Sequence, residues 1–260
     1  MMNDINMAIK TTTECNGICN NCSVRVWMDA DPGWHASLGD IDRFINFSIR
    51  SGYTYNIVNL TGGEPLLWHN LIEGCRMLKQ SGLIKELCLY TNALLCNTLK
   101  GLGVLEQIIE DLDYVRMSLY HGNEEDIEMC MSRGFPENKI RVSEQRNRPV
   151  PPLHPIENSL PARCHCAGYA LDHSRVFICG PAPTLIFAHG LSFDDYAYMM
   201  DDLRDNFLDR LSAVDIYNQE LCRYCIGNTK VTEVVPAVPC VIKKREMQHE
   251  PVGTESIKAA

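Results

Sequence analysis

The chain has 260 residues, enough for one large domain or one domain with a small appendage. Its formal net charge of −9 argues against a nucleic-acid backbone as the main partner, because such partners favour basic patches. No apolar run approaches the roughly 18 residues of a transmembrane helix, and the N-terminus lacks the pattern of a signal peptide. We therefore expect a cytoplasmic protein that does not contact membranes.

Short apolar runs alternate with amphipathic stretches along the first part of the chain. The apolar runs predict strands at residues 5–11, 55–60, 87–90, 114–119 and 139–142. Apolar side chains at helical spacing predict helices at residues 40–50, 70–82, 97–112 and 124–132, the third capped by Asn97. This alternation implies parallel βαβ units with right-handed crossovers, hence an α/β fold. In α/β barrels the active site lies at the C-terminal ends of the strands.

The second half of the chain has a different character. Five prolines between residues 146 and 162 exclude a regular helix or central strand, so we expect a segment that crosses between domains, with at most a poor sixth strand. A hairpin is predicted over residues 169–179 and a long helix over residues 193–214. The organisation that we predict is a core at 1–145, a crossing segment at 146–162, a small cysteine-bearing domain at 163–240 and a flexible tail at 241–260.

The chain has 13 cysteines, an odd number that fits a fully disulfide-paired domain poorly. Clustered cysteines in a reducing compartment favour metal ligands. Core packing is expected for the cysteines that stand apart, because free cysteine is among the most buried residue types. These are Cys75, Cys88, Cys96 and Cys130, and Cys240 is also expected to be a bystander.

Two motifs follow the first two predicted strands. Cys15, Cys19 and Cys22 stand at C-x3-C-x2-C, and three thiolates from one short loop can hold three corners of a cubane iron–sulfur cluster. An electron-transfer cluster normally has four cysteine ligands, so something else would bind the last iron. Part of a zinc site is the alternative. The second motif, Gly62-Gly63-Glu64-Pro65, contains glycines that allow close backbone approach to a ligand.

Together these motifs resemble the radical S-adenosylmethionine (radical SAM) enzymes, whose core is a partial (β/α)6 barrel. The resemblance implies that Cys15, Cys19 and Cys22 hold a [4Fe–4S] cluster and that SAM chelates its open iron. It also implies that Gly62, Gly63 and Glu64 hold the amino group of SAM. Asn92 and Ser118 are placed for its carboxylate or ribose, or for satisfying local backbone. The sequence departs from the family at Asn21, where an aromatic residue is usual.

The second half resembles the twitch appendage of radical SAM enzymes, an α+β relative of the SPASM domain. The shared order is cysteine, hairpin, cysteine, helix and C-x2-C. The resemblance implies a second, auxiliary [4Fe–4S] cluster, with a structural zinc site as the alternative. Its expected ligands are Cys166, Cys179, Cys222 and Cys225, with Cys164 as the competing first ligand. The spacing from Cys166 to Cys179 is similar to that in the molybdenum-cofactor cyclases.

In radical SAM enzymes, SAM is cleaved to a 5′-deoxyadenosyl radical, which abstracts a hydrogen atom from the substrate. What then happens to the substrate radical decides the reaction. The length and layout resemble the aminocyclitol dehydrogenase of this family, which implies net oxidation of a small polar substrate of aminoglycoside or cyclitol type. Alternatively, an unassigned thiol such as Cys164 or Cys96 returns a hydrogen and makes the enzyme an epimerase. A peptide-modifying maturase and an iron–sulfur electron carrier are the remaining alternatives. The family resemblance implies flavodoxin or ferredoxin as the electron donor.

Overall fold

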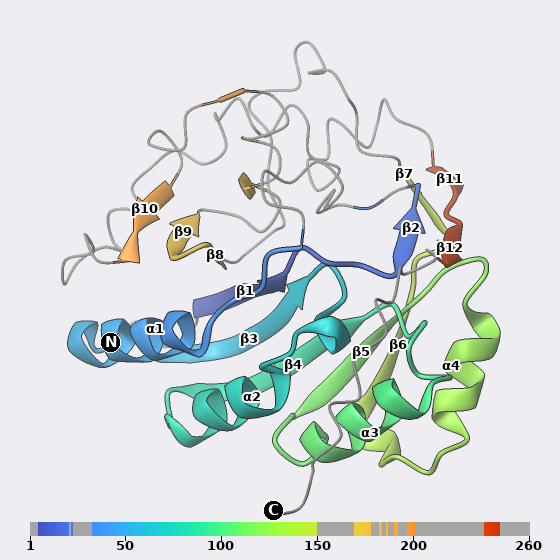
Figure 1. Ribbon diagram of the computed structural model, residues 1–260, viewed down its shortest axis with the longest axis horizontal. Helices are drawn as coiled ribbons and strands as arrows, with labels where there is room; N and C mark the ends of the chain where they lie inside the picture. The colour runs from blue at the N-terminus through green and yellow to red at the C-terminus, as the bar shows by residue number, and fades with distance from the viewer. Residues whose placement is uncertain are drawn as a thin grey trace, which may run out of the picture.

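The computed structural model describes residues 5–20, 22, 33–149, 169–177, 182–183, 186, 190–191, 197–200 and 237–244. Its centre is an eight-stranded sheet in the order β10-β9-β8-β1-β3-β4-β5-β6 (Figure 1). The strands of this sheet are β1 (Ile5–Thr12), β3 (Tyr55–Gly62), β4 (Ile84–Thr91), β5 (Tyr114–Leu119), β6 (Ile140–Glu144), β8 (Tyr169–Asp172), β9 (Arg175–Phe177) and β10 (Ala197–Met199).

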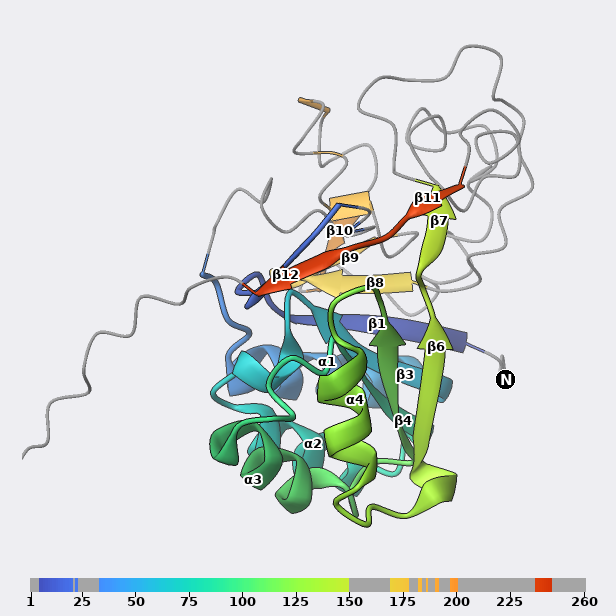
Figure 2. The same ribbon diagram turned by 90° about the vertical axis from the view of Figure 1, so that its right-hand side faces the viewer.

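Strands β1, β3, β4, β5 and β6 pair in parallel, which confirms the predicted parallel sheet. Because β6 and β10 stand at opposite ends of the strand order, the sheet is open, as in a partial barrel. The predicted helices are also present, as α1 (Leu38–Ser51), α2 (Leu71–Gln80), α3 (Leu99–Ile108) and α4 (Glu124–Met131). All of them lie on one face of the sheet (Figures 1 and 2). No described helix is long and apolar enough to cross a membrane.

Local sequence explains where these helices begin and end. Ser37 and Asp40 form a capping box at the start of α1, and Gly52 ends that helix with a φ of 68°. The predicted cap of α3 was one residue out, because the Thr98 side chain accepts from the Gly101 amide. Asn97 instead donates to Asp126 on α4.

Alternation along the strands separates an apolar face from a polar one. Leu60, Leu89 and Met117 are fully buried and belong to the core between the sheet and the helices. We call the opposite face the inner face. The alternation of side chains along each strand and the pairing of the strands place these polar residues on the inner face: Lys10, Asn59, Thr61, Tyr90, Arg116, Ser118, Arg141 and Ser143.

The predicted hairpin forms, but it is not separate from the barrel sheet. Strand β8 pairs antiparallel with β9 and also pairs in parallel with β1. A buried ion pair of 2.9 Å between Lys10 on β1 and Asp172 on β8 accompanies this pairing. Among the described residues, β8 is thus the sixth strand that pairs in parallel, and residues 150–162 lie outside the described part. Strand β7 (Asn147–Pro149) pairs with β11 (Ala237–Pro239) in a separate small sheet.

The helix predicted over residues 193–214 is wrong at its start. Ala197–Met199 forms β10, which pairs antiparallel with β9 at the edge of the sheet. Pairing with an open strand edge overrode the helical spacing of the apolar side chains. Residues 201–214 of this prediction lie outside the described residues.

The C-terminal segment contains a strand that the sequence did not predict. β12 (Ile242–Lys244) pairs with β2 (Gly17–Cys19), which is part of the cysteine loop. Ile242 is buried against Gly17, and Lys244 forms an ion pair of 3.0 Å with Asp126. Residues 241–244 therefore do not belong to the predicted flexible tail, while residues 245–260 lie outside the described part.

Candidate functional site

Three cysteines lie on the loop that follows β1. Cys15, Cys19 and Cys22 are each half-buried, and the Cys22 amide donates to the Cys19 carbonyl at 3.4 Å. Burial, followed by the charge of Glu64, raises the pKa of Cys15 to about 12. Burial, followed by the charges of Cys22 and Cys15, raises the pKa of Cys19. The thiols are therefore close enough to oppose one another's ionisation.

This mutual opposition fits the loop to an iron–sulfur cluster. Three neighbouring thiolates are unfavourable without cations, and irons bound to them would supply the compensating positive charge. Among the described residues, no three His, Cys, Asp or Glu side chains are grouped closely enough to hold a single metal ion. In a cubane cluster each thiolate binds a different iron, so the thiols need only surround the cluster.

The glycines that end β3 bring the second motif against the cysteine loop. Gly62 has a φ of 134°, and the Gly63 amide donates to the Thr12 carbonyl at 2.7 Å. The Glu64 amide donates to the Glu14 carbonyl, also at 2.7 Å. A Cβ at Gly63 would overlap the Glu14 carbonyl oxygen and lie 2.6 Å from its carbon. Gly63 thus allows the turn after β3 to lie directly against the backbone of Glu14, the residue before Cys15.

The Glu64 side chain is fully buried and joins the ends of β3 and β4. Its carboxylate accepts from the Thr91 hydroxyl at 2.8 Å, the Asn92 amide at 2.8 Å and the Leu66 amide at 3.1 Å. Burial raises the pKa of Glu64 to about 7, although these hydrogen bonds act in the opposite direction. These three hydrogen bonds tie the ends of β3 and β4 together through the Glu64 carboxylate.

This pKa makes the stability of the apo-protein dependent on pH. Between an unfolded pKa of 4.5 and a folded pKa of about 7, the folded state binds more protons than the unfolded state. The free energy of unfolding should therefore fall as pH rises through this window, by up to about 3 kcal/mol from this group. Glu64→Gln should remove that component, measured as the difference from wild type in urea unfolding at pH 5 and pH 8.

Glu73→Gln, on the exposed face of α2, is the matched control and should leave the pH dependence unchanged. A Glu64→Gln protein with the same pH dependence as wild type would contradict the assignment.

Asn92 connects several parts of the site. Its side-chain amide donates to Asn16 at 3.0 Å and lies 3.7 Å from the Cys15 sulfur. Its carbonyl accepts from the side chain of Asn123 at 2.7 Å, and Asn123 also donates to the Ser118 carbonyl. The ends of β4 and β5 are thereby fixed beside the cysteine loop, which brings both Asn92 and Ser118 into the site.

A group of polar side chains near this loop was not predicted from the sequence. Glu14, which precedes Cys15, contacts the His35 ring at 3.1 Å, and the rings of His35 and His69 lie 4.7 Å apart. Lys10 was missed as well. The available signal was its charge within an otherwise apolar strand, which marks the inner face; no comparable signal pointed to the histidines.

The four cysteines expected to pack in the core are all fully buried. Cys96 and Cys130 are hydrogen-bonded to each other through their thiols, and both belong to the core cluster. Cys240 is also buried, close enough to Cys19 to raise its pKa. The cysteines assigned to the auxiliary site lie outside the described residues: Cys164, Cys166, Cys179, Cys222 and Cys225.

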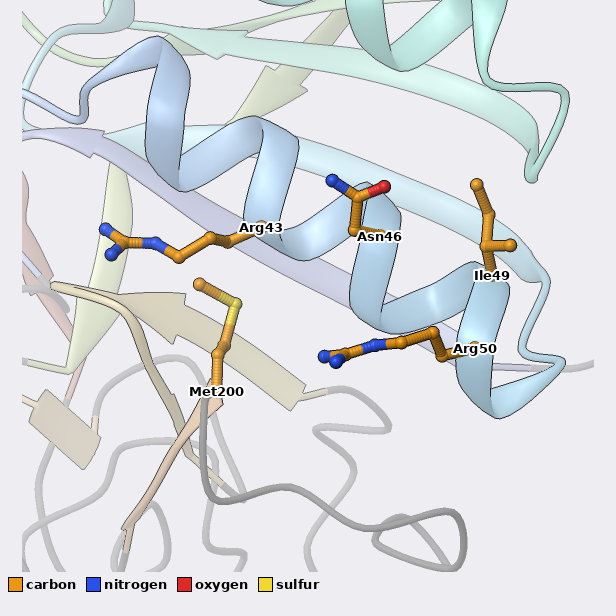
Figure 3. Close-up of a pocket in the computed structure, with 5 residues that line it drawn as sticks. All are labelled: Arg43, Asn46, Ile49, Arg50 and Met200. Atoms are coloured by element: carbon orange, nitrogen blue, oxygen red, sulfur yellow. The ribbon is translucent and has the colours of Figure 1, made fainter.

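A cavity of about 380 Å³ lies away from this site. Figure 3 shows its lining, which comes from α1 and the residue after β10: Arg43, Asn46, Ile49, Arg50 and Met200. Arg43 is already bonded to Asp40 at 2.6 Å and to Ser174 at 3.0 Å. The cavity contains no side chain from the cysteine loop or the strand ends, so we do not include it in the candidate site.

Two solved structures have a fold similar to that of this chain. A crystal structure of BtrN in complex with AdoMet and 2-DOIA has a TM-score of 0.56 and 13% sequence identity, covering 85% of this chain and 92% of that chain. A structure of BtrN in an open conformation has a TM-score of 0.53 and 14% identity, covering 85% and 91%. At these identities the likeness concerns the fold alone. No curated protein matches the sequence.

The model of the radical SAM superfamily matches residues 9–145, which is more than half of the chain. The matched segment contains the C-terminal half of β1, the cysteine loop, the Gly62–Glu64 turn and the strand ends that meet them. This family uses a [4Fe–4S] cluster together with SAM. The chain belongs to the radical SAM superfamily.

Proposed function

We propose that this protein is a radical SAM oxidoreductase that abstracts hydrogen from a small polar substrate and oxidises it by two electrons. The observation that carries the proposal is the hydrogen-bonded contact between the cysteine loop and the Gly62–Glu64 turn at the strand ends. When bound, the cluster and SAM supply a 5′-deoxyadenosyl radical. The protein supplies position and exclusion of water.

Each side of this contact has a distinct task in the proposal. Cys15, Cys19 and Cys22 would hold the cluster. Gly62, Gly63 and Glu64 would hold the SAM amino group, and their backbone carbonyls suit this role because a carbonyl oxygen has two lone pairs. Asn92, whose amide lies beside the Cys15 sulfur, would face the methionine part of SAM. The Ser118 hydroxyl has no partner among the described residues, so we assign it to the carboxylate or ribose.

Net oxidation of an alcohol needs a second electron acceptor. Once the radical has taken a hydrogen atom from the carbinol carbon, the substrate must lose one more electron and the hydroxyl proton to become a ketone. We propose that Cys166, Cys179, Cys222 and Cys225, with Cys164 as the alternative first ligand, hold an auxiliary [4Fe–4S] cluster able to accept that electron. The likeness to the structure of BtrN with AdoMet and 2-DOIA supports a small-molecule substrate, and an aminoglycoside or cyclitol intermediate is the class that we propose.

Cys222→Ala combined with Cys225→Ala tests the auxiliary cluster. The reconstituted wild type should contain about eight irons per chain and the double variant about four, because each cubane holds four irons. The variant should still bind SAM but lose substrate turnover. Cys75→Ala is the control for removing a cysteine from the core. Zinc in place of iron, or an unchanged iron content in the double variant, would reject the second cluster.

The substrate and the reaction are tested together by anaerobic turnover with deuterated candidate substrates. Transfer of deuterium into 5′-deoxyadenosine would identify both the substrate and the carbon, and the product should be two electrons more oxidised. A product at the oxidation level of the substrate, together with a radical that accumulates when one unligated cysteine is replaced, would favour epimerisation instead.

A further inference from the structure

We propose that the inner face of the sheet contains a subsite for an anionic group of the substrate, a carboxylate or a phosphate, centred on Arg116. The proposal rests on the proposed function and narrows its substrate class to members that carry an anionic group. The side chains that carry it belong to β4, β5 and β6 and face away from the helices.

The register of these strands aligns three inner-face side chains in one row. Arg116 on β5 pairs with Tyr90 on β4 and with Arg141 on β6. The next inner-face pair toward the strand ends is Ser118 with Ser143. Two residues of a strand span about 7 Å, so the row lies one layer below the strand ends where the cysteine loop is fixed.

Aromatic rings orient the two guanidinium groups. Arg116 lies 5.0 Å from the centre of the Tyr90 ring and 5.9 Å from that of Tyr114, and it is hydrogen-bonded to Tyr90. Arg141 lies 3.7 Å from the centre of the Tyr114 ring. Tyr114 is itself buried and hydrogen-bonded to Cys88. Guanidinium groups held over aromatic rings are oriented for bidentate contact with an anion.

These arginines lack the carboxylate partner that the other inner-face cation has. Lys10 is neutralised by Asp172 at 2.9 Å, whereas no ion pair is made by Arg116 or Arg141 among the described residues. Glu86, an inner-face carboxylate nearer the start of β4, is paired with neither. Arg116 is half-buried, and its remaining N–H groups need acceptors that the rings do not provide.

A second polar group without a hydrogen-bond partner among the described residues indicates what else the ligand carries. The side-chain oxygen of Asn59 is buried and accepts no hydrogen bond from the described residues. Asn59 pairs with Cys88, which pairs with Tyr114, so Asn59 lies on β3 in the inner-face row one layer below Arg116. β3 and β5 are two strand spacings apart, about 10 Å, and the two rows are about 7 Å apart along the strands, so the two backbone positions are separated by about 12 Å, which long side chains and a sugar-sized molecule can bridge. The Arg116 guanidinium and the Asn59 side-chain oxygen together fit a hydroxylated molecule with one anionic end.

The test uses molecules of one carbon skeleton and different charge: glucose, glucosamine, glucuronate and glucose 6-phosphate. Equilibrium binding to the reconstituted holoenzyme with SAM should favour an anionic member over glucose and glucosamine by about ten-fold or more, as one charge-assisted pair provides. The tighter of glucuronate and glucose 6-phosphate identifies carboxylate or phosphate as the source. Arg116→Gln should abolish the preference, and Arg116→Lys should retain part of it.

Arg76→Gln, an exposed arginine of α2, is the matched control and should bind the series as wild type does. Equal or tighter binding of the neutral or cationic member, or no measurable binding of the anionic ones, would overturn the proposal. An anion preference that survives Arg116→Gln would also overturn it. If Arg116→Gln lowered the affinity for SAM as much as the affinity for the anionic sugar, Arg116 would be assigned to the carboxylate of SAM instead. Reduced wild type that fails to cleave SAM would reject the proposed function while leaving the charge preference measurable.

Discussion

Replacing Cys15, Cys19 and Cys22 together with alanine is expected to remove about four irons per chain and to abolish SAM cleavage. The expectation follows from the position of the three thiols, which lie on one loop and influence one another's pKa. Iron and sulfide analysis after anaerobic reconstitution measures the first effect. Release of 5′-deoxyadenosine from the reduced protein measures the second.

The fold should survive this triple substitution, because the loop is held by its backbone. Thr13 donates to the Trp34 carbonyl at 2.9 Å, and β2 pairs with β12. Circular dichroism should therefore match that of wild type, and the iron that remains should be that of the proposed second cluster. SAM cleavage by a folded triple variant would show that this loop does not hold the active cluster.

The sequence predicted those parts of the fold that local pattern controls. Each strand from β1 to β6 in the main sheet carries an alternating or continuous apolar run, and each helix from α1 to α4 has an apolar stripe. The predictions failed where a distant partner decides the structure. Ala197–Met199 is a strand because it meets β9, and Ile242–Lys244 is a strand because it meets β2. No local pattern contains those partners.

The candidate site likewise has parts that local sequence predicted and parts that depend on distant partners. The cysteine motif and the Gly62–Glu64 turn could be recognised because their spacing along the chain is itself the signal. The partners of Glu64, the contact of Asn92 with Cys15 and the row around Arg116 depend on strand register. A charged residue inside an apolar strand, such as Arg116 or Lys10, was the available sign of a polar inner face.

Gly63→Val is expected to disturb the cluster as well as SAM binding. If the glycine only allowed a ligand to approach the backbone, as its sequence motif suggests, Gly63→Val would weaken SAM binding and leave the cluster intact. The structure gives a different reason, because even a Cβ at Gly63 would overlap the Glu14 carbonyl next to Cys15. Glu14 also accepts from the Glu64 amide, so the branched side chain must separate the turn from the cysteine loop.

The effect is best measured in the Cys222→Ala, Cys225→Ala background, where about four irons report the first cluster alone. Adding Gly63→Val should lower that content to about half or less, and SAM affinity should fall by about ten-fold or more, since forced overlap with fixed backbone costs about 1–3 kcal/mol. Gly103→Val on α3 is the matched control, because a Cβ there meets no atom within 4 Å. If Gly63→Val keeps its full iron content and loses only SAM affinity, the glycine serves the ligand directly. If instead iron and SAM affinity fall together, Gly63 acts by letting the turn support the loop that carries the cluster.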